Sequence, residues 1–269
     1  MGDELHDEGD TVPNQAPTQV QSVDRALAIL DLLAQRGEVG VTELAAELTV
    51  HKSTAFRLVT ALERRQLVVQ VGDRGKYRLG LGVLRLAAAT TGRLEVTREG
   101  QAVCERLARE LGETVNIAIL DEGSAINVLQ EFGNAAVGSR NWIGRRTSLH
   151  ATSSGKVLLA FADETLRKAI LSETLERHTE KTVTDPAELR RQLDETVSLG
   201  WAGTNEELEV GLTAVAAPIR DGSGRVIAAV SVSGPSYRLA PDSFADVADR
   251  VIEGATEIST RLGHYLAPK

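Results

Sequence analysis

The sequence predicts an α+β protein with an N-terminal winged helix-turn-helix, a connecting helix and a C-terminal α/β domain. Residues 41–65 hold two short runs with apolar side chains at helical spacing, separated by a tight turn at residues 49–51. Residues 67–79 then switch to the two-residue alternation of a hairpin. From residue 95 onward, helical stretches alternate with paired strand candidates, which is typical of a sheet covered by helices.

Composition and charge limit the possible classes of protein. The chain has 269 residues, of which 42% are hydrophobic and 25% are charged, so it can bury the cores of one large or two ordinary domains. The net charge is −8, but residues 20–94 contain more lysine and arginine than acidic residues, and the remainder is strongly acidic. A basic module joined to an acidic body is expected of a DNA reader with a separate sensing or assembly domain.

The cysteine content and the first residues of the sequence indicate the cellular compartment of the protein. The single cysteine, Cys104, excludes an internal disulfide framework and fits a reducing cytoplasm. No apolar run approaches the ~20 residues of a membrane span, and the acidic start is unlike a secretory signal. We therefore expect a cytoplasmic protein without membrane contact. Residues 1–19 contain few apolar side chains that could be buried in a core, so this segment is predicted to be a disordered acidic tail.

Residues 20–79 are predicted to form the winged helix-turn-helix domain. Its first helix starts near Ser22 and ends at Gly37. In the second helix of the motif, one stripe is apolar and the opposite face carries hydroxyl and guanidinium groups. These outward residues are Ser53, Arg57, Thr60 and Arg64. Such groups donate to base edges in the major groove or to phosphate oxygens.

The hairpin is predicted to pair residues 67–71 with residues 76–79 around a turn at residues 72–75. Its basic tip would lie along the sugar-phosphate backbone as a wing. A small core with merely solvated faces is the alternative, but the basic residues gather on the helix face and the hairpin tip together. The predicted DNA-binding residues are Lys52, Ser53, Thr54, Arg57, Thr60, Arg64, Arg74, Lys76 and Arg78.

Residues 80–94 predict a linker helix with Leu81, Leu84, Ala87 and Ala88 on one stripe. Such a helix either packs on its own chain or pairs with a second copy. Small alanines allow helices to approach closely, and helix-turn-helix proteins commonly bind paired half-sites as dimers. We therefore favour pairing.

Residues 95–269 alternate between helices and hairpins. Helices are predicted at residues 96–111, 152–161, 163–172, 185–200 and 242–262, and strands at residues 115–120, 125–131, 214–220 and 226–233. The clearest signals are the capping sequence Asp185-Pro186-Ala187-Glu188 and the hairpin turn Asp221-Gly222-Ser223-Gly224. This order predicts a curved sheet with packed helices, a shape suited to holding a small ligand.

Six segments in this order resemble the IclR family of bacterial transcriptional regulators, over nearly the whole chain after Gln19. They are SVDRALAILDLL at 22–33, KSTAFRLVTAL at 52–62, YRLG at 77–80, LHATSSGKVLLA at 149–160, NEELEVGLTAVAAPI at 205–219 and SVSGP at 231–235. The resemblance implies a winged helix-turn-helix, a linker helix and a GAF-like effector-binding domain. It also implies homodimers that pair as dimers of dimers on DNA, and effectors that are organic acids, aromatic acids or ureide-type metabolites.

By position, the resemblance places the effector pocket on Trp142, Ile143, Leu149, Ser153, Ser154, Thr204, Ala214, Ser231 and Ser233. Unpaired N–H groups at a helix start, with serine hydroxyls beside them, would suit a carboxylate or another polar oxygen. Helix capping would also explain Ser153 and Ser154, and ordinary strand polarity would explain the later serines. Two positions depart from the family, since Thr204 and Ala214 stand where members that bind small acids often have an acidic residue and a cysteine. A third, Thr49, stands where a glycine often ends the first helix of the motif.

Two other functions compete with this interpretation. Ser153-Ser154-Gly155-Lys156 matches the S-x-x-K nucleophile motif of serine acyl-enzymes, although the supporting S-D-N and K-T-G motifs are missing. A C-terminal domain that only oligomerises is the second, but small and hydroxylated residues recur where a cavity is expected. Scattered histidines without neighbouring cysteine predict no metal, and we expect no cofactor. The sequence thus predicts a non-enzymatic, metabolite-controlled transcriptional repressor.

Overall fold

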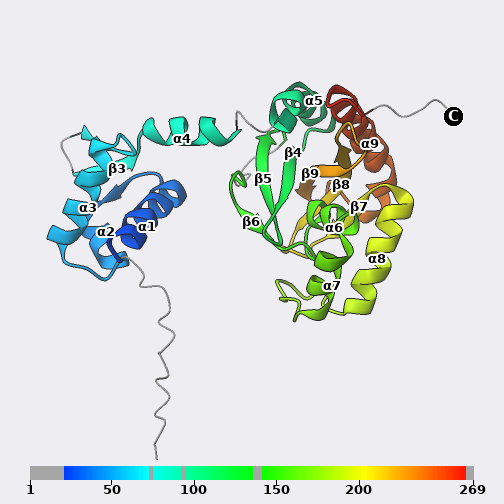
Figure 1. Ribbon diagram of the computed structural model, residues 1–269, viewed down its shortest axis with the longest axis horizontal. Coiled ribbons are helices and arrows are strands. Elements are labelled where there is room, and N and C mark those ends of the chain that lie inside the picture. Colours follow the sequence, from blue (N-terminus) through cyan, green and yellow to red (C-terminus); the bar gives the residue numbers. More distant parts are fainter. Residues whose placement is uncertain (1–20, 73–74, 92–94, 136–140, 265–269) are drawn as a thin grey trace, which may run out of the picture. The chain divides into compact units, whose positions relative to one another are not determined.

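The computed structural model describes residues 21–72, 75–91, 95–135 and 141–264, with side chains except those of residues 87–91 (Figure 1). The predicted tail at residues 1–19 lies outside the described residues, as does Arg74. The chain divides into two compact units, residues 1–90 and residues 91–269.

The first unit is a winged helix-turn-helix, as predicted (Figure 1). Its elements are α1 (Gln21–Arg36), β1 (Val39–Gly40), α2 (Val41–Glu47), α3 (Lys52–Arg64), β2 (Val68–Val71), β3 (Lys76–Leu79) and α4 (Gly82–Thr91). The strands form an antiparallel sheet in the order β1-β3-β2. The fully buried side chains of Ile29, Leu44 and Val59 bring the three helices onto one apolar core. The short strand β1 was not predicted, because two residues carry no periodicity.

The turn between α2 and α3 contains a strained residue. Thr49 has a φ of 53°, in the left-handed region that disfavours β-branched side chains. The backbone is held there because the N–H of Val50 donates to the carbonyl of Ala45 at 2.9 Å. The glycine expected from the resemblance would adopt this conformation without strain.

The start of α4 is fixed by a close backbone approach. A Cβ atom on Gly80 would lie 2.3 Å from the carbonyl oxygen of Gln66, so only glycine fits there. The backbone N–H of Gly80 donates to the carbonyl of Leu67, and that of Gly82 donates to the carbonyl of Gln66. The Arg85 guanidinium also donates to the side-chain oxygen of Gln66 at 2.6 Å. The first turn of α4 is therefore attached to the segment that follows α3.

The second unit is a six-stranded antiparallel sheet with helices on both faces (Figure 1). Its strands are β4 (Thr114–Asp121), β5 (Ser124–Glu131), β6 (Arg146–Thr147), β7 (Ala202–Asn205), β8 (Leu212–Arg220) and β9 (Val226–Pro235), in the order β6-β5-β4-β9-β8-β7. Its helices are α5 (Glu95–Leu111), α6 (Ser153–Ala160), α7 (Glu164–Ser172), α8 (Pro186–Leu199) and α9 (Phe244–Arg261), with a short 3-10 turn, η2 (Pro241–Ser243), before the last. The strands β6 and β7 were not predicted because they are too short to show alternation.

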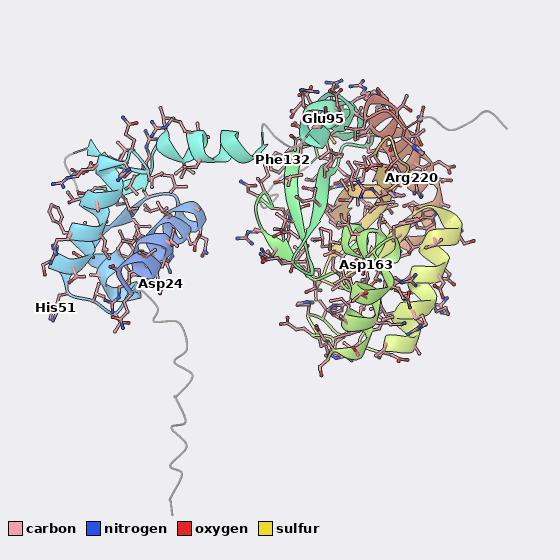
Figure 2. All side chains as sticks on the ribbon, viewed as in Figure 1. Asp24, His51, Glu95, Phe132, Asp163 and Arg220 are labelled. Atoms are coloured by element: carbon pink, nitrogen blue, oxygen red, sulfur yellow. The ribbon has the colours of Figure 1, made fainter. Side chains whose placement is uncertain are left out.

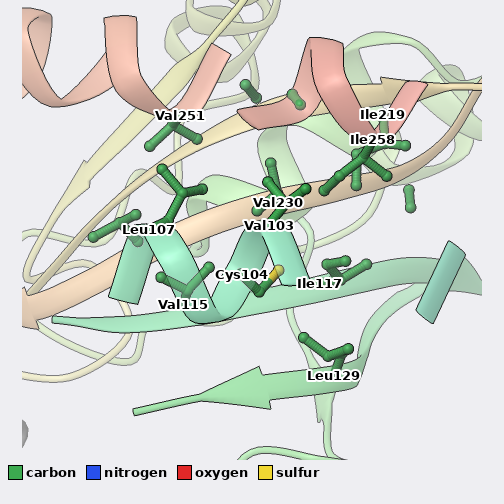
Figure 3. Close-up of a cluster of buried hydrophobic side chains, with 14 of the residues drawn as sticks. Val103, Cys104, Leu107, Val115, Ile117, Leu129, Ile219, Val230, Val251 and Ile258 are labelled. Carbon is green, nitrogen blue, oxygen red and sulfur yellow. The ribbon is translucent and has the colours of Figure 1, made fainter. Parts of the chain in front are cut away.

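The two faces of this sheet differ. On one face, α5 and α9 pack against alternate strand residues such as Val115 and Ile117, and Figure 3 shows these with Cys104 between them. Burial raises the pKa of the Cys104 thiol to about 12, so this cysteine is a packing residue. The other face packs against α6, α7 and α8 through a second apolar cluster that includes Leu159 and Leu189.

Helix ends follow the predicted caps. The carboxylate of Asp185 accepts from the N–H of Ala187 at 3.0 Å, Pro186 occupies the first position of α8, and Gly200 ends this helix at a φ of 77°. No helix among the residues described is long and apolar enough to cross a membrane.

Replacement of Thr49 by glycine should stabilise the N-terminal unit by about 1 kcal/mol, because the left-handed conformation costs an L-residue about 1–2 kcal/mol and glycine loses only part of this gain to chain entropy. Hydrogen exchange of core amides in α1 and α3 would measure the effect. Ala46→Gly is the control, since it places glycine in the α2 helix and should destabilise the unit by about 1 kcal/mol. Equal destabilisation by both variants would contradict the assignment of strain to Thr49.

Candidate functional site

The outer face of α3 carries most of the predicted DNA-binding residues. Ala55, Val59 and Leu62 are buried against the unit's core, and the opposite face is solvent-facing. Figure 2 shows His51, the N-cap residue, at the start of this helix. Lys52, Ser53, Arg57 and Arg64 are exposed, and Thr54 and Thr60 are half-buried.

The hydroxyl of Thr60 is already in use. It donates to the carbonyl of Phe56 at 2.9 Å, one helical turn back. Thr60 can therefore still accept a hydrogen bond but has no free proton to donate. This restricts it to contact with a donor, such as a base amino group.

The hairpin exposes two of its three predicted basic residues, and the third, Arg74, lies outside the described residues. In β3, Lys76 and Arg78 are exposed on one face, and Tyr77 between them is buried in the core. The register pairs Val71 with Lys76, so Lys76 stands at the end of the described hairpin next to the turn. Alternation therefore places two cations on the outer side of the wing.

Phe56, which has an exposed side chain, was not among the residues predicted from the sequence to bind DNA. It is 53% exposed on α3 and lines a groove of about 710 Å³ between α3, the start of α2 and the wing. Lys52, Thr60 and Lys76 line the same groove, as does the carboxylate of Glu63. A helical wheel places Phe56 away from the buried stripe, and this was the signal available in the sequence.

A polar cavity lies between α6 and the sheet of the second unit. The cavity has a volume of about 60 Å³, enough for several waters or a compact ligand. Seven of the nine predicted pocket residues line it: Trp142, Ser153, Ser154, Thr204, Ala214, Ser231 and Ser233. Strand register explains the grouping, because Thr204 pairs with Ala214 and Ala214 pairs with Ser233 across β7, β8 and β9.

Two predicted pocket residues do not line the cavity. Leu149 is 2% exposed and belongs to the apolar cluster beneath α6, where its backbone lies so close to Gly155 that a Cβ there would clash. Ile143 is 50% exposed and lies beside β5 instead, bridged to Asn127. The apolar wall is formed by Leu208 and Leu212, which were not predicted.

Further polar residues line the cavity that were not predicted from the sequence. Asn116 on β4, Asn127 on β5, Thr147 on β6, and Thr152 and Thr213 contribute to the cavity. Asn116 pairs with Ser231, so the two side chains share one face of the sheet. The signal was a polar residue between Val115 and Ile117 in an otherwise apolar strand. All the lining residues within the described part of the chain are uncharged.

The start of α6 is capped by Thr152. Its hydroxyl oxygen accepts from the N–H of Gly155 at 3.1 Å and donates to the carbonyl of Ser148 at 2.9 Å. Ser153 and Ser154 therefore do not cap the helix, although both are buried against the cavity. Their hydroxyls and the first backbone N–H groups of α6 could donate hydrogen bonds to a polar oxygen of a ligand in the cavity.

Lys156 forms a buried ion pair. Its Nζ lies 2.7 Å from both carboxylate oxygens of Glu207 and 2.7 Å from Oε1 of Gln192. Burial lowers the pKa of Lys156, and the Glu207 carboxylate opposes that shift. All three ammonium protons thus have acceptors, so this lysine is poorly placed to act as the base of an S-x-x-K nucleophile.

A histidine pair supports the segment before α6. His150 donates from Nε2 to the carbonyl of Glu176 at 2.8 Å, and His178 lies 2.8 Å from the Ser148 hydroxyl. The rings stack with 5.8 Å between centroids. Burial lowers the pKa of His150, so its ring is neutral at pH 7. No group of three metal-ligating side chains occurs in the part of the chain that the structure describes.

Lys156→Met should destabilise the second unit by about 3–5 kcal/mol, because it leaves the Glu207 carboxylate buried without a partner. The double variant Lys156→Met/Glu207→Leu should return to within about 1 kcal/mol of the wild type. Urea unfolding can be followed through the chain's two tryptophans, Trp142 and Trp201, which both lie in this unit. Additive losses in the double variant would contradict the ion-pair assignment.

Comparison with known proteins agrees with both units. The family model described as "IclR helix-turn-helix domain" matches residues 22–72, and "Bacterial transcriptional regulator IclR C-terminal" matches residues 88–260. The chain is 36% identical to the HTH-type transcriptional repressor AllR of Klebsiella pneumoniae over 245 residues, 90% of each chain.

Two solved structures share the fold. The IclR protein of Thermotoga maritima superposes with a TM-score of 0.78 at 28% identity, over 90% of this chain and 99% of that one. An IclR homologue from Microbacterium hydrocarbonoxydans, complexed with 4-hydroxybenzoate, gives 0.77 at 28% identity, over 90% and 98%. These relatives are regulators of transcription and not enzymes. The chain belongs to the IclR family of bacterial transcriptional regulators, which bind DNA through the helix-turn-helix unit.

Proposed function

We propose that this regulator is a repressor whose DNA binding is controlled by a small metabolite in the polar cavity. The observation that carries the proposal is the gathering of seven predicted pocket residues around one cavity at the start of α6. A domain that only oligomerised would be expected to fill this space with apolar side chains. The name of the relative AllR, a transcriptional repressor, supports the repressor role. The 4-hydroxybenzoate complex of the Microbacterium homologue supports control by a small molecule.

The DNA contacts divide into two groups. Ser53, Arg57, Thr60 and Arg64 on α3 enter the major groove and read base edges. Residues at the start of α3 and in the wing bind phosphates and set the orientation; these are Lys52, Thr54, Arg74, Lys76 and Arg78. Arg57 is the main discriminating residue, because a guanidinium can donate two parallel hydrogen bonds to guanine.

Pairing of linker helices would create the DNA-binding dimer. Leu81 is 79% exposed and Leu84 is 63% exposed, although both belong to the predicted apolar stripe. Exposed leucines at helical spacing favour burial against a second copy. Two recognition helices would then meet paired half-sites, and two dimers would assemble on one operator.

The effector is an organic acid, an aromatic acid or a ureide-type compound, with a polar oxygen at the N–H groups and serines that start α6. It controls DNA binding only through a difference in its affinity for two arrangements of the dimer. Binding at α6 would shift that equilibrium and so change the separation of the recognition helices.

The DNA contacts can be tested on an operator selected from a random-sequence DNA pool. Arg57→Ala should reduce the preference for that operator over non-specific DNA by about 1–3 kcal/mol, because base contacts are lost. Lys76→Ala should instead weaken binding to all DNA, because a phosphate contact is lost. The slope of the logarithm of the binding constant against the logarithm of the salt concentration should become shallower by about one.

Arg191→Ala is the charge-matched control, since Arg191 lies on α8 in the other unit and pairs with Glu188 and Glu195. An Arg57→Ala variant with the same operator preference as this control would overturn the recognition-face assignment. Failure of the wild type to select any sequence would overturn sequence-specific binding itself.

A further inference from the structure

One buried polar atom in the cavity has no partner within the protein. Asn116 is 4% exposed, and its side chain lines the cavity from β4. Its Nδ2 lies 3.4 Å from the hydroxyl oxygen of Ser233, but its Oδ1 has no hydrogen-bond partner among the residues that the structure describes. Such an atom is unusual, because buried side-chain polar atoms are nearly always paired.

The orientation of this amide follows from its neighbour. The Ser233 hydroxyl is directed at the carbonyl oxygen of Thr114, 3.5 Å away, which can only accept. Ser233 therefore offers a lone pair to Asn116, and the amide nitrogen is the end that meets it. The oxygen of Asn116 is left as a buried, unpaired acceptor on a residue that lines the cavity.

The two ends of the cavity thus have different requirements. At the α6 end, the first N–H groups and the hydroxyls of Ser153 and Ser154 supply donors, so they match an acceptor oxygen. At the β4 end, the Asn116 oxygen needs a donor. Among the residues that the structure describes, those that line the cavity are all uncharged, so none of them would balance a buried ammonium group, and the matching donor is a neutral hydroxyl or amide N–H.

We propose that Asn116 is a specificity-determining residue that accepts a hydrogen bond from the effector. The ligand class is then a compact molecule with a carboxylate or carbonyl at one end and an uncharged O–H or N–H donor at the other, such as a hydroxy acid or a ureido acid. Acids without a distal donor, and amines, are rejected. This inference rests on the proposed role of the cavity as the effector site.

The ligand-free protein provides the first test. Asn116→Leu removes an unpaired polar atom and should leave the midpoint temperature of the second unit unchanged or raise it. Thr213→Val is the matched control from the same lining, because the Thr213 hydroxyl already donates to the carbonyl of Leu239 at 2.6 Å. This control should lower the midpoint. A larger loss in Asn116→Leu than in Thr213→Val would show that Asn116 has a structural role and would overturn the proposal.

Binding of matched compounds provides the second test. Calorimetric titration of the full chain would compare glycolate with fluoroacetate, and 4-hydroxybenzoate with 4-fluorobenzoate, since fluorine replaces the hydroxyl at similar size but cannot donate. The wild type should bind the hydroxyl member of at least one pair roughly tenfold more tightly, or better, because the fluoro compound leaves Asn116 unpaired. Asn116→Leu should abolish this preference.

Each other outcome has a distinct meaning. Equal binding of both members of a pair by the wild type, or a preference that persists in Asn116→Leu, overturns the role of Asn116 while the cavity remains an effector site. Failure of all four compounds to bind the wild type would overturn both the ligand class and the cavity as a site for compact acids.

Discussion

The ion pair between Lys156 and Glu207 holds together the part of the protein on which the cavity depends. It joins the first turn of α6 to the segment between β7 and β8, two pieces of chain that are 51 residues apart. That segment continues to Leu208 and Leu212, which form the apolar wall of the cavity. Thr182 also donates to the backbone carbonyl of Glu207 at 2.7 Å. A buried pair of this kind contributes little net stability, but it fixes the geometry because breaking it on one side is costly.

The sheet then separates rigid support from ligand recognition. Its α5–α9 face is filled with aliphatic side chains such as Val115 and Ile117 (Figure 3). The opposite face carries polar side chains under the start of α6. Because side chains alternate along each strand, Asn116 faces the cavity while its two neighbours anchor β4 in the apolar cluster. The polar lining can therefore vary without loss of the apolar core.

Local signals predicted the elements, and long-range contacts limited the prediction of the site. The caps of α8 and the alternation of Ser231 and Ser233 are visible within a few residues, so these features were predictable. The acceptor of Lys156 and the pairing of Asn116 with Ser231 depend on residues far along the chain, which no local pattern shows. Leu149 was wrongly expected in the lining because an apolar residue before a helix can face either the ligand or the core beneath it.

The central claim is that the cavity controls DNA binding. The direct measurement is the affinity for a selected operator in the wild type and in the pocket-filling variant Ser154→Trp. Each is titrated with the organic acid, aromatic acid or ureide that most raises the thermal stability of the wild type. The account predicts at least a roughly fivefold change in the wild type, within the usual range of allosteric coupling. It predicts unchanged basal DNA affinity and no response in Ser154→Trp. A full response in the filled variant, or no response in the wild type to any organic acid, aromatic acid or ureide, would contradict it.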